Sequence, residues 1–182
     1  MRVQLDLLAG EPEGTGEDRH HQRAQDVMAR RIHGCDLAFE QPVETTIEGT
    51  HLGGGKDCVR VRVAAIAPFL AMKGIVLDNR LNPKDAYDIY YCVLHYPGGI
   101  ESLIAEIRPF LRHVLAREGL AIIARHFASA DHLGPRMVTD FLEITDREEL
   151  ERVRRDAYER VNHVLKELDI GQTSAGVELQ TD

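Results

Sequence analysis

Residues 66–93 read IAPFLAMKGIVLDNRLNPKDAYDIYYCV, and this stretch decides the fold because the hydrophobic period changes there. Upstream, apolar and polar residues alternate over 2–9, 43–49 and 58–63, which predicts β-strands. From residue 65 onward, apolar residues recur every three or four positions, which predicts helices. Strands followed by helices are typical of an α+β protein with a helical C-terminal half.

The remaining segments complete this outline. A short strand is predicted at 36–40, a short helix at 19–28 and a glycine turn at 53–55. The tail from 171 to 182 is predicted to be disordered. Further helices are predicted at 100–108, 110–117, 120–128 and 147–168.

The helix that follows residue 82 has a clear start signal. Asn82 is a favourable N-cap, Pro83 occupies the first helical position, and Asp85 lies in the first turn. The nearby tyrosines Tyr87, Tyr90 and Tyr91 are predicted to pack between helices rather than to stack on bases. The helix should end before the Pro-Gly-Gly turn at 97–99.

Composition limits the classes of function. The chain has 182 residues, enough for one compact domain or a small domain with a helical extension. Its net charge of −8 argues against broad, sequence-independent binding of nucleic acid. No signal-peptide pattern and no apolar stretch of about 18 residues occurs, so we expect a cytoplasmic protein with no membrane association. The three cysteines form no C-x-x-C pair, so no zinc ribbon or redox motif is predicted.

Lys73 is the most informative single residue. It falls within the predicted apolar face of the helix that begins near residue 65. Burying an unpaired ammonium is costly, so Lys73 needs an anionic partner or a route to solvent. Two interpretations remain open at this point: a stem that lies along the edge of the core, and a lysine that binds phosphate or stabilises charge.

Three aspartates are candidates for chemistry. Asp85, at the border of the apolar face, is the stronger candidate on the second helix: it could pair with Lys73, bind a metal or act as a base, or simply stabilise the helix N-terminus. Asp88 lies farther round and should form a surface ion pair with Lys84. Asp6 occupies a strand, where a metal site or an exposed sheet face would each explain it.

Three segments together resemble the nucleotidyltransferases of the AbiEii/AbiGii toxin type. They are VRVRV at 59–63, FLAMKG at 69–74 and RLNPKDAYDIYY at 80–91. The sequence VQLDLL at 3–8 also resembles the family strand that bears an acidic residue of the metal site. The resemblance extends loosely over residues 2–99, and motifs of this length are moderately specific.

The resemblance implies Mg²⁺-dependent transfer of a nucleotide from a nucleoside triphosphate to an RNA or protein acceptor, by a toxin paired with an antitoxin. It also implies a partial mixed β-sheet of the nucleotidyltransferase type in the N-terminal half. Lys73 and Lys84 would contact the triphosphate, and Asp85 would orient Lys73 or help to deprotonate the acceptor. Asp6 would be a metal carboxylate, with Asp88 as a second candidate ligand.

The family's Gly-Ser turn and Asp-x-Asp pair have no counterpart here, since five residues precede Asp6. We therefore expect an incomplete nucleotidyltransferase-like β-rich portion at 1–64, a helical portion with both motifs at 65–170, and the tail at 171–182. Three alternatives follow: a chain truncated upstream, an inactive relative that serves as a binding or interaction module, or a site completed by a partner. A homodimer would be one way to cover the sheet edge that the missing strands expose.

Overall fold

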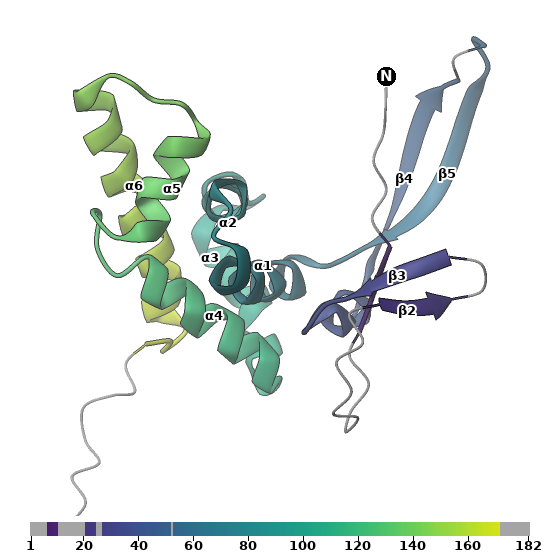
Figure 1. Ribbon diagram of the computed structural model, residues 1–182, viewed down its shortest axis with the longest axis horizontal. Coiled ribbons are helices and arrows are strands. Elements are labelled where there is room, and N and C mark those ends of the chain that lie inside the picture. The colour runs from purple at the N-terminus through teal and green to yellow at the C-terminus, as the bar shows by residue number, and fades with distance from the viewer. Residues whose placement is uncertain (1–6, 11–20, 25–26, 52, 172–182) are drawn as a thin grey trace, which may run out of the picture. The chain divides into compact units, whose positions relative to one another are not determined.

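The computed structural model describes residues 7–10, 21–24, 27–51 and 53–171 (Figure 1). The chain divides into two compact units, Met1–Phe69 and Leu70–Asp182, and each is described by itself below. Strands lie in the first unit and most of the helical residues in the second. The protein therefore has the α+β class that the sequence predicts.

The first unit contains a small mixed sheet with strand order β1-β3-β2. Strand β1 (Leu8–Ala9) pairs in parallel with β3 (Val27–Arg31), and β2 (His21–Ala24) pairs with β3 in antiparallel fashion. The helix predicted at 19–28 is therefore wrong. Backbone pairing of β3 with strands on both sides outweighs the weak helical preference of this polar segment.

A second correction concerns the strand predicted at 36–40. The chain instead forms a 3-10 helix, η1 (Cys35–Phe39), which follows Gly34 in the left-handed conformation at φ 77°. The bond from Leu37 N–H to the Gly34 carbonyl, 3.1 Å, closes the first turn. Gly34 redirects the chain because a residue without Cβ adopts positive φ at little cost. Cys35 and Leu37 are buried by this turn.

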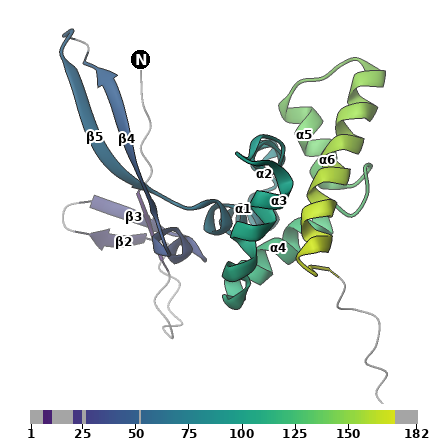
Figure 2. The same ribbon diagram turned by 180° about the vertical axis from the view of Figure 1, so that it is seen from behind.

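The predicted strands at 43–49 and 58–63 form an antiparallel ribbon, β4 (Val43–Thr50) and β5 (Lys56–Val63), which is visible from both sides in Figures 1 and 2. The glycine turn predicted between them is confirmed: Gly54 has φ 86° and His51 N–H donates to the Gly55 carbonyl over 2.7 Å. Strand alternation gathers apolar side chains on one face of the ribbon, where four of them are about half exposed: Val43, Ile47, Val59 and Val63.

The second unit is helical. Its helices are α1 (Ile66–Arg80, whose first residues belong to the first unit), α2 (Pro83–His95), α3 (Gly99–Ile107), the 3-10 helix η2 (Arg108–Arg112), α4 (Val114–His126), α5 (Leu133–Phe141) and α6 (Arg147–Glu167). Among the described residues, no helix is long and apolar enough to cross a membrane.

The helix predicted at 147–168 is confirmed as α6, and its apolar stripe, Val153, Ala157, Val161 and Val164, is buried. Its N-cap Asp146 accepts from the Glu149 N–H over 2.8 Å. Helix α2 packs against both α5 and α6, and Tyr90 donates its hydroxyl to Asp156 of α6 over 2.6 Å. The predicted tail lies, apart from Gly171, outside the described residues.

The predictions differ from the structure in two ways in the middle of the second unit. The predicted break between 117 and 120 does not exist, because Gly119 lies inside the single helix α4, and α5 was not predicted. Gly119 is there because α4 approaches α1 backbone to backbone. A Cβ on Gly119 would lie 2.2 Å from the Ala71 carbonyl oxygen, and one on Gly74 would lie 2.0 Å from the Gly119 carbonyl oxygen. The glycine is a packing requirement and not a helix end.

Replacing Gly119 with alanine should therefore destabilise the protein by about 2 kcal/mol, because the helices must separate to admit one methyl group. Intrinsic helix propensity would act in the opposite direction by about 1 kcal/mol. Urea unfolding followed by helical circular dichroism measures the change. The control is Glu118→Ala, an exposed neighbour on the same helix, which should shift stability by less than about 0.5 kcal/mol. A Gly119→Ala variant as stable as Glu118→Ala would contradict the close helix contact.

Candidate functional site

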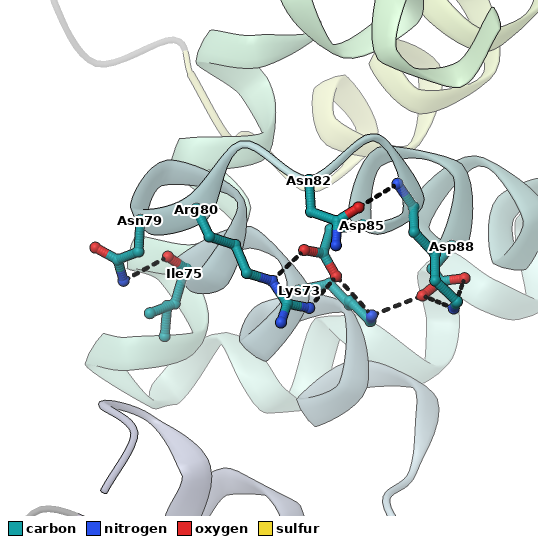
Figure 3. A network of polar contacts seen from close by, with 8 residues as sticks. Lys73, Ile75, Asn79, Arg80, Asn82, Asp85 and Asp88 are labelled. Atoms are coloured by element: carbon teal, nitrogen blue, oxygen red, sulfur yellow. Dashed lines mark hydrogen bonds and ion pairs between the residues drawn. The ribbon is translucent and has the colours of Figure 1, made fainter. Parts of the chain in front are cut away.

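The candidate site lies where α1 passes into α2 through the two residues Leu81 and Asn82 (Figure 3). Asn82 has extended backbone angles and its side chain accepts from Lys84 N–H over 3.1 Å, which confirms the predicted N-cap. Leu81 adopts a left-handed φ of 46°, which reverses the chain sharply. This short connection brings the last two turns of α1 beside the first two turns of α2.

Asp85 is the centre of the site. Its side chain has no exposed surface, and three charge-assisted hydrogen bonds reach its two oxygens. Lys73 Nζ lies 2.8 Å from Oδ1, and the Arg80 guanidinium donates through Nε to Oδ2 at 2.7 Å and through Nη2 to Oδ1 at 2.9 Å. Burial by itself would raise the pKa of Asp85, but the bonds from Arg80 and Lys73 outweigh burial and lower it. Asp85 is therefore an ionised, fully satisfied carboxylate.

Asp88 extends the network one helical turn further. Its Oδ2 accepts from Lys73 Nζ over 2.6 Å, and Lys84 Nζ lies 2.8 Å from Oδ2 and 2.9 Å from Oδ1. Lys73 thus bridges two carboxylates on the facing helix. Burial favours the neutral amine, but the hydrogen bonds with Asp85 and Asp88 raise the pKa of Lys73 above its ordinary value. The ammonium is therefore charged throughout the physiological pH range.

The structure corrects the position of Lys73 on its helix. The buried face of α1 contains Ala67, Leu70, Ala71 and Ile75, so it is rotated from the predicted face, and Lys73 lies on its flank with 18% of its side chain exposed. The ammonium does have the anionic partner that burial requires, in Asp85. The side chain of Lys73 is also partly exposed, as expected for a stem that lies along the edge of the core.

The other predicted residues have different outcomes. Asp88 forms the predicted ion pair with Lys84. It also contacts Lys73 and its side chain is only 17% exposed, so the pair is less exposed than the predicted surface ion pair. Asp6 lies outside the described residues. Arg80 was not predicted as a site residue. The sequence does show that Arg80 lies five residues before Asp85, in the last turn of α1. The two side chains come into contact because the chain reverses at Leu81.

The cluster, comprising Lys73, Arg80, Lys84, Asp85 and Asp88, carries three positive and two negative charges. Arg80 and Lys84 are about half exposed, at 54% and 57%, so they form its solvent-facing rim. Lys73 is the least exposed of the three cations, with 18% of its side chain exposed.

The same geometry does not fit Mg²⁺ at Asp85 or Asp88. All four carboxylate oxygens already accept from ammonium or guanidinium groups, and Asp85 is closed to solvent. Mg²⁺ needs carboxylate or water oxygens in a nearly regular octahedron, which these engaged oxygens do not offer. Within the described part of the chain, no group of three His, Cys, Asp or Glu side chains is arranged to hold a metal.

Comparison with protein-family models, with curated proteins and with solved structures found no match.

Replacing Asp85 with asparagine should destabilise the protein by about 3 kcal/mol near pH 7, because Lys73 and Arg80 lose the buried charge they neutralise. The pKa of Asp85 is lower in the folded protein than in the unfolded chain, so its ionised form stabilises the fold. This stabilisation is fully present above about pH 4 and is lost as the pH falls below that value. The difference in unfolding free energy between wild type and Asp85→Asn should therefore be constant from about pH 5 to 7 and shrink below about pH 4. Urea unfolding across this range measures both.

The matched control is Asp78→Asn. Asp78 also pairs with a guanidinium and a histidine, Arg125 and His126, but its side chain is 49% exposed, so the loss should stay below about 1 kcal/mol. Equal effects of the two substitutions, or a wild-type advantage that grows as the pH falls below 4, would show that Asp85 is not the buried anion described above.

Proposed function

We propose that this protein binds a nucleoside triphosphate at the cluster and is a nucleotidyltransferase-like protein of the AbiEii/AbiGii toxin type. The reaction would transfer a nucleotide to an RNA or protein acceptor, and an antitoxin would be the natural partner of such a toxin. The observation that carries the proposal is the ammonium of Lys73, held by Asp85 and Asp88 between two helices with Arg80 and Lys84 at the rim.

Transfer of a nucleotide from a triphosphate requires cations that are already in position. Charge builds up on the phosphate oxygens and on the departing pyrophosphate, and a cation that is already positioned stabilises that charge without reorganising. Two carboxylates restrict Lys73, which would otherwise rotate about a flexible stem. Arg80 contributes a planar fork whose position is set by its two bonds to Asp85.

The geometry also supports a choice between the two roles considered for Asp85. A general base works best with a pKa near the working pH and with a lone pair open to the proton it removes. Asp85 has a lowered pKa, is closed to solvent, and accepts three bonds from cations. We therefore assign it the positioning of Lys73 and Arg80, and not deprotonation of the acceptor.

Mg²⁺ is the metal that the resemblance implies. Because Asp85 and Asp88 do not fit Mg²⁺, we assign no metal ligand within the cluster, and the proposed carboxylate Asp6 stays a prediction. Because the oxygens of Asp85 and Asp88 are occupied by bonds from cations, a second candidate function is favoured. In it, the chain binds nucleotide without catalysing its transfer and acts as a binding or interaction module.

Nucleotide binding is tested with a fluorescent nucleoside triphosphate. Lys84→Gln should weaken binding about tenfold or more, since a charge-assisted bond to phosphate is lost while a half-exposed side chain is changed. Lys73→Gln should weaken triphosphate binding further. Because Asp85 loses a partner in this variant, its melting temperature is measured to check that it is folded. Lys166→Gln, an exposed site on α6, makes the same charge change elsewhere and should bind like wild type. Absence of triphosphate binding by wild type, or equal affinity of Lys84→Gln and Lys166→Gln, would refute the proposal.

The two candidate functions differ in turnover. Incubating the full chain with each of the four labelled triphosphates, Mg²⁺ and total RNA or protein should label an acceptor if the chain is an enzyme. If the chain binds triphosphate but labels no acceptor with any of the four triphosphates, the second candidate function, a binding or interaction module, is supported.

A further inference from the structure

The ribbon of β4 and β5 has two free edges in the part of the chain that the structure describes, because each strand pairs only with the other. The backbone N–H and C=O groups along a free edge are a template for another strand, and a two-stranded ribbon is by itself of marginal stability. The ribbon also leaves Ile47 52% exposed and its cross-strand partner Val59 47% exposed. Both features favour the addition of a strand at one edge.

The hydrogen bonds at the turn show which residues can pair outward. The bond from His51 N–H to the Gly55 carbonyl makes these two residues a hydrogen-bonded pair. Hydrogen-bonded pairs alternate along an antiparallel ladder, so the odd-numbered residues of β4 bond to β5 and the even-numbered ones direct their backbone groups outward. The outward-directed residues are Glu44, Thr46, Glu48 and Thr50 on β4, and Lys56, Cys58, Arg60 and Arg62 on β5.

The charges on the edge of β5 oppose self-association there. Two copies of β5 can pair in an antiparallel sense only in registers that match outward-directed residues. In the two registers nearest the centre of the strand, either Arg60 faces the second copy's Arg60, or Lys56 faces the second copy's Arg62. Like charges directly opposite each other are destabilising, and cations on an edge strand are a known protection against pairing.

The edge of β4 does allow two copies to pair. Two registers near the centre of the strand match the outward-directed residues. In one of them Glu44 faces the second copy's Glu48, so like charges oppose each other. In the other, Ile47 faces the second copy's Ile47 on a two-fold axis, while Thr46 faces Glu48 and Glu44 faces Thr50. Charge therefore selects the second register.

We propose that two copies of this chain associate through β4, antiparallel and about a two-fold axis at Ile47, to form a four-stranded sheet. The two Ile47 side chains contact each other and Val59 flanks each of them on the same face, so the contact buries part of the exposed apolar surface. Pairing of β4 with β5 of another copy also matches charges, but it leaves a free edge at each end and continues as an open chain. The contact between two β4 strands closes.

Proline substitution tests the backbone hydrogen bonds between the copies. Thr46→Pro removes an outward N–H from each copy and should raise the dissociation constant of the dimer about tenfold or more. Arg60→Pro is the matched control, because Arg60 lies opposite Thr46 in the ribbon and its N–H points outward from β5. This variant should stay within about twofold of wild type. Sedimentation equilibrium of the full chain over a range of concentrations measures both constants.

Cysteine cross-linking tests the register. In a Cys58→Ser background, which removes the exposed native thiol, Ile47→Cys should form a disulfide between copies on mild oxidation. The two Cα atoms would be about 4.5 Å apart, within range of a disulfide. Val59→Cys is the control on the same face, one strand farther from the axis. Its two sulfur-bearing residues would be about 14 Å apart and should not cross-link.

Three results would overturn the proposal: a chain that stays monomeric at every concentration, species that keep growing as the concentration rises, and a Thr46→Pro dimer as stable as wild type. Cross-linking of Val59→Cys as efficient as that of Ile47→Cys would also overturn it, because the ribbons would then stack face to face. If both proline variants weaken the dimer equally, the absence of a cross-link in Ile47→Cys refutes the β4 contact.

Discussion

Burial of one charge, Asp85, organises the contacts between α1 and α2. An ionised carboxylate without solvent contact is tolerated only if cations and hydrogen bonds replace its lost hydration. Lys73 and Arg80 supply them from the preceding helix, and each must cross from α1 to α2 to do so. The reversal at Leu81 makes both contacts possible, because it brings the end of α1 beside the start of α2.

The same interaction makes Asp85 unsuited to acid–base chemistry. A carboxylate that neutralises two cations is held ionised and is a poor proton acceptor, but it keeps those cations in place. Lys73 and the Arg80 fork are fixed by their carboxylates, whereas Lys84 remains half exposed. Three of the five charged residues of the cluster, Lys84, Asp85 and Asp88, are placed by one helix, α2.

Local signals predicted several elements correctly because those signals act within a few residues. The Asn82 cap, the start of α2 and the apolar stripe of α6 depend on backbone geometry and on helical period alone. The ribbon of β4 and β5 was likewise predictable from alternation on both sides of a glycine turn. Predictions failed where distant partners decided the outcome. Residues 21–24 and 27–31 form strands because β3 has neighbours on both sides, and Gly119 lies inside a helix because α1 approaches it closely.

For the site, the sequence by itself determined the chemical types and the spacing: a lysine on one helix, and a Lys-Asp-x-x-Asp pattern at the start of the next. It could also show that a lysine near an apolar face requires a compensating anion. Which anion, and in what geometry, was decided by tertiary structure. The rotation of α1 put Lys73 on the flank of the buried face, the reversal at Leu81 brought Arg80 onto Asp85, and packing of α5 placed Phe141 on Tyr87. The physical reason is that spacing along a chain specifies the face of one helix, whereas contacts between helices depend on how the helices turn and pack against one another.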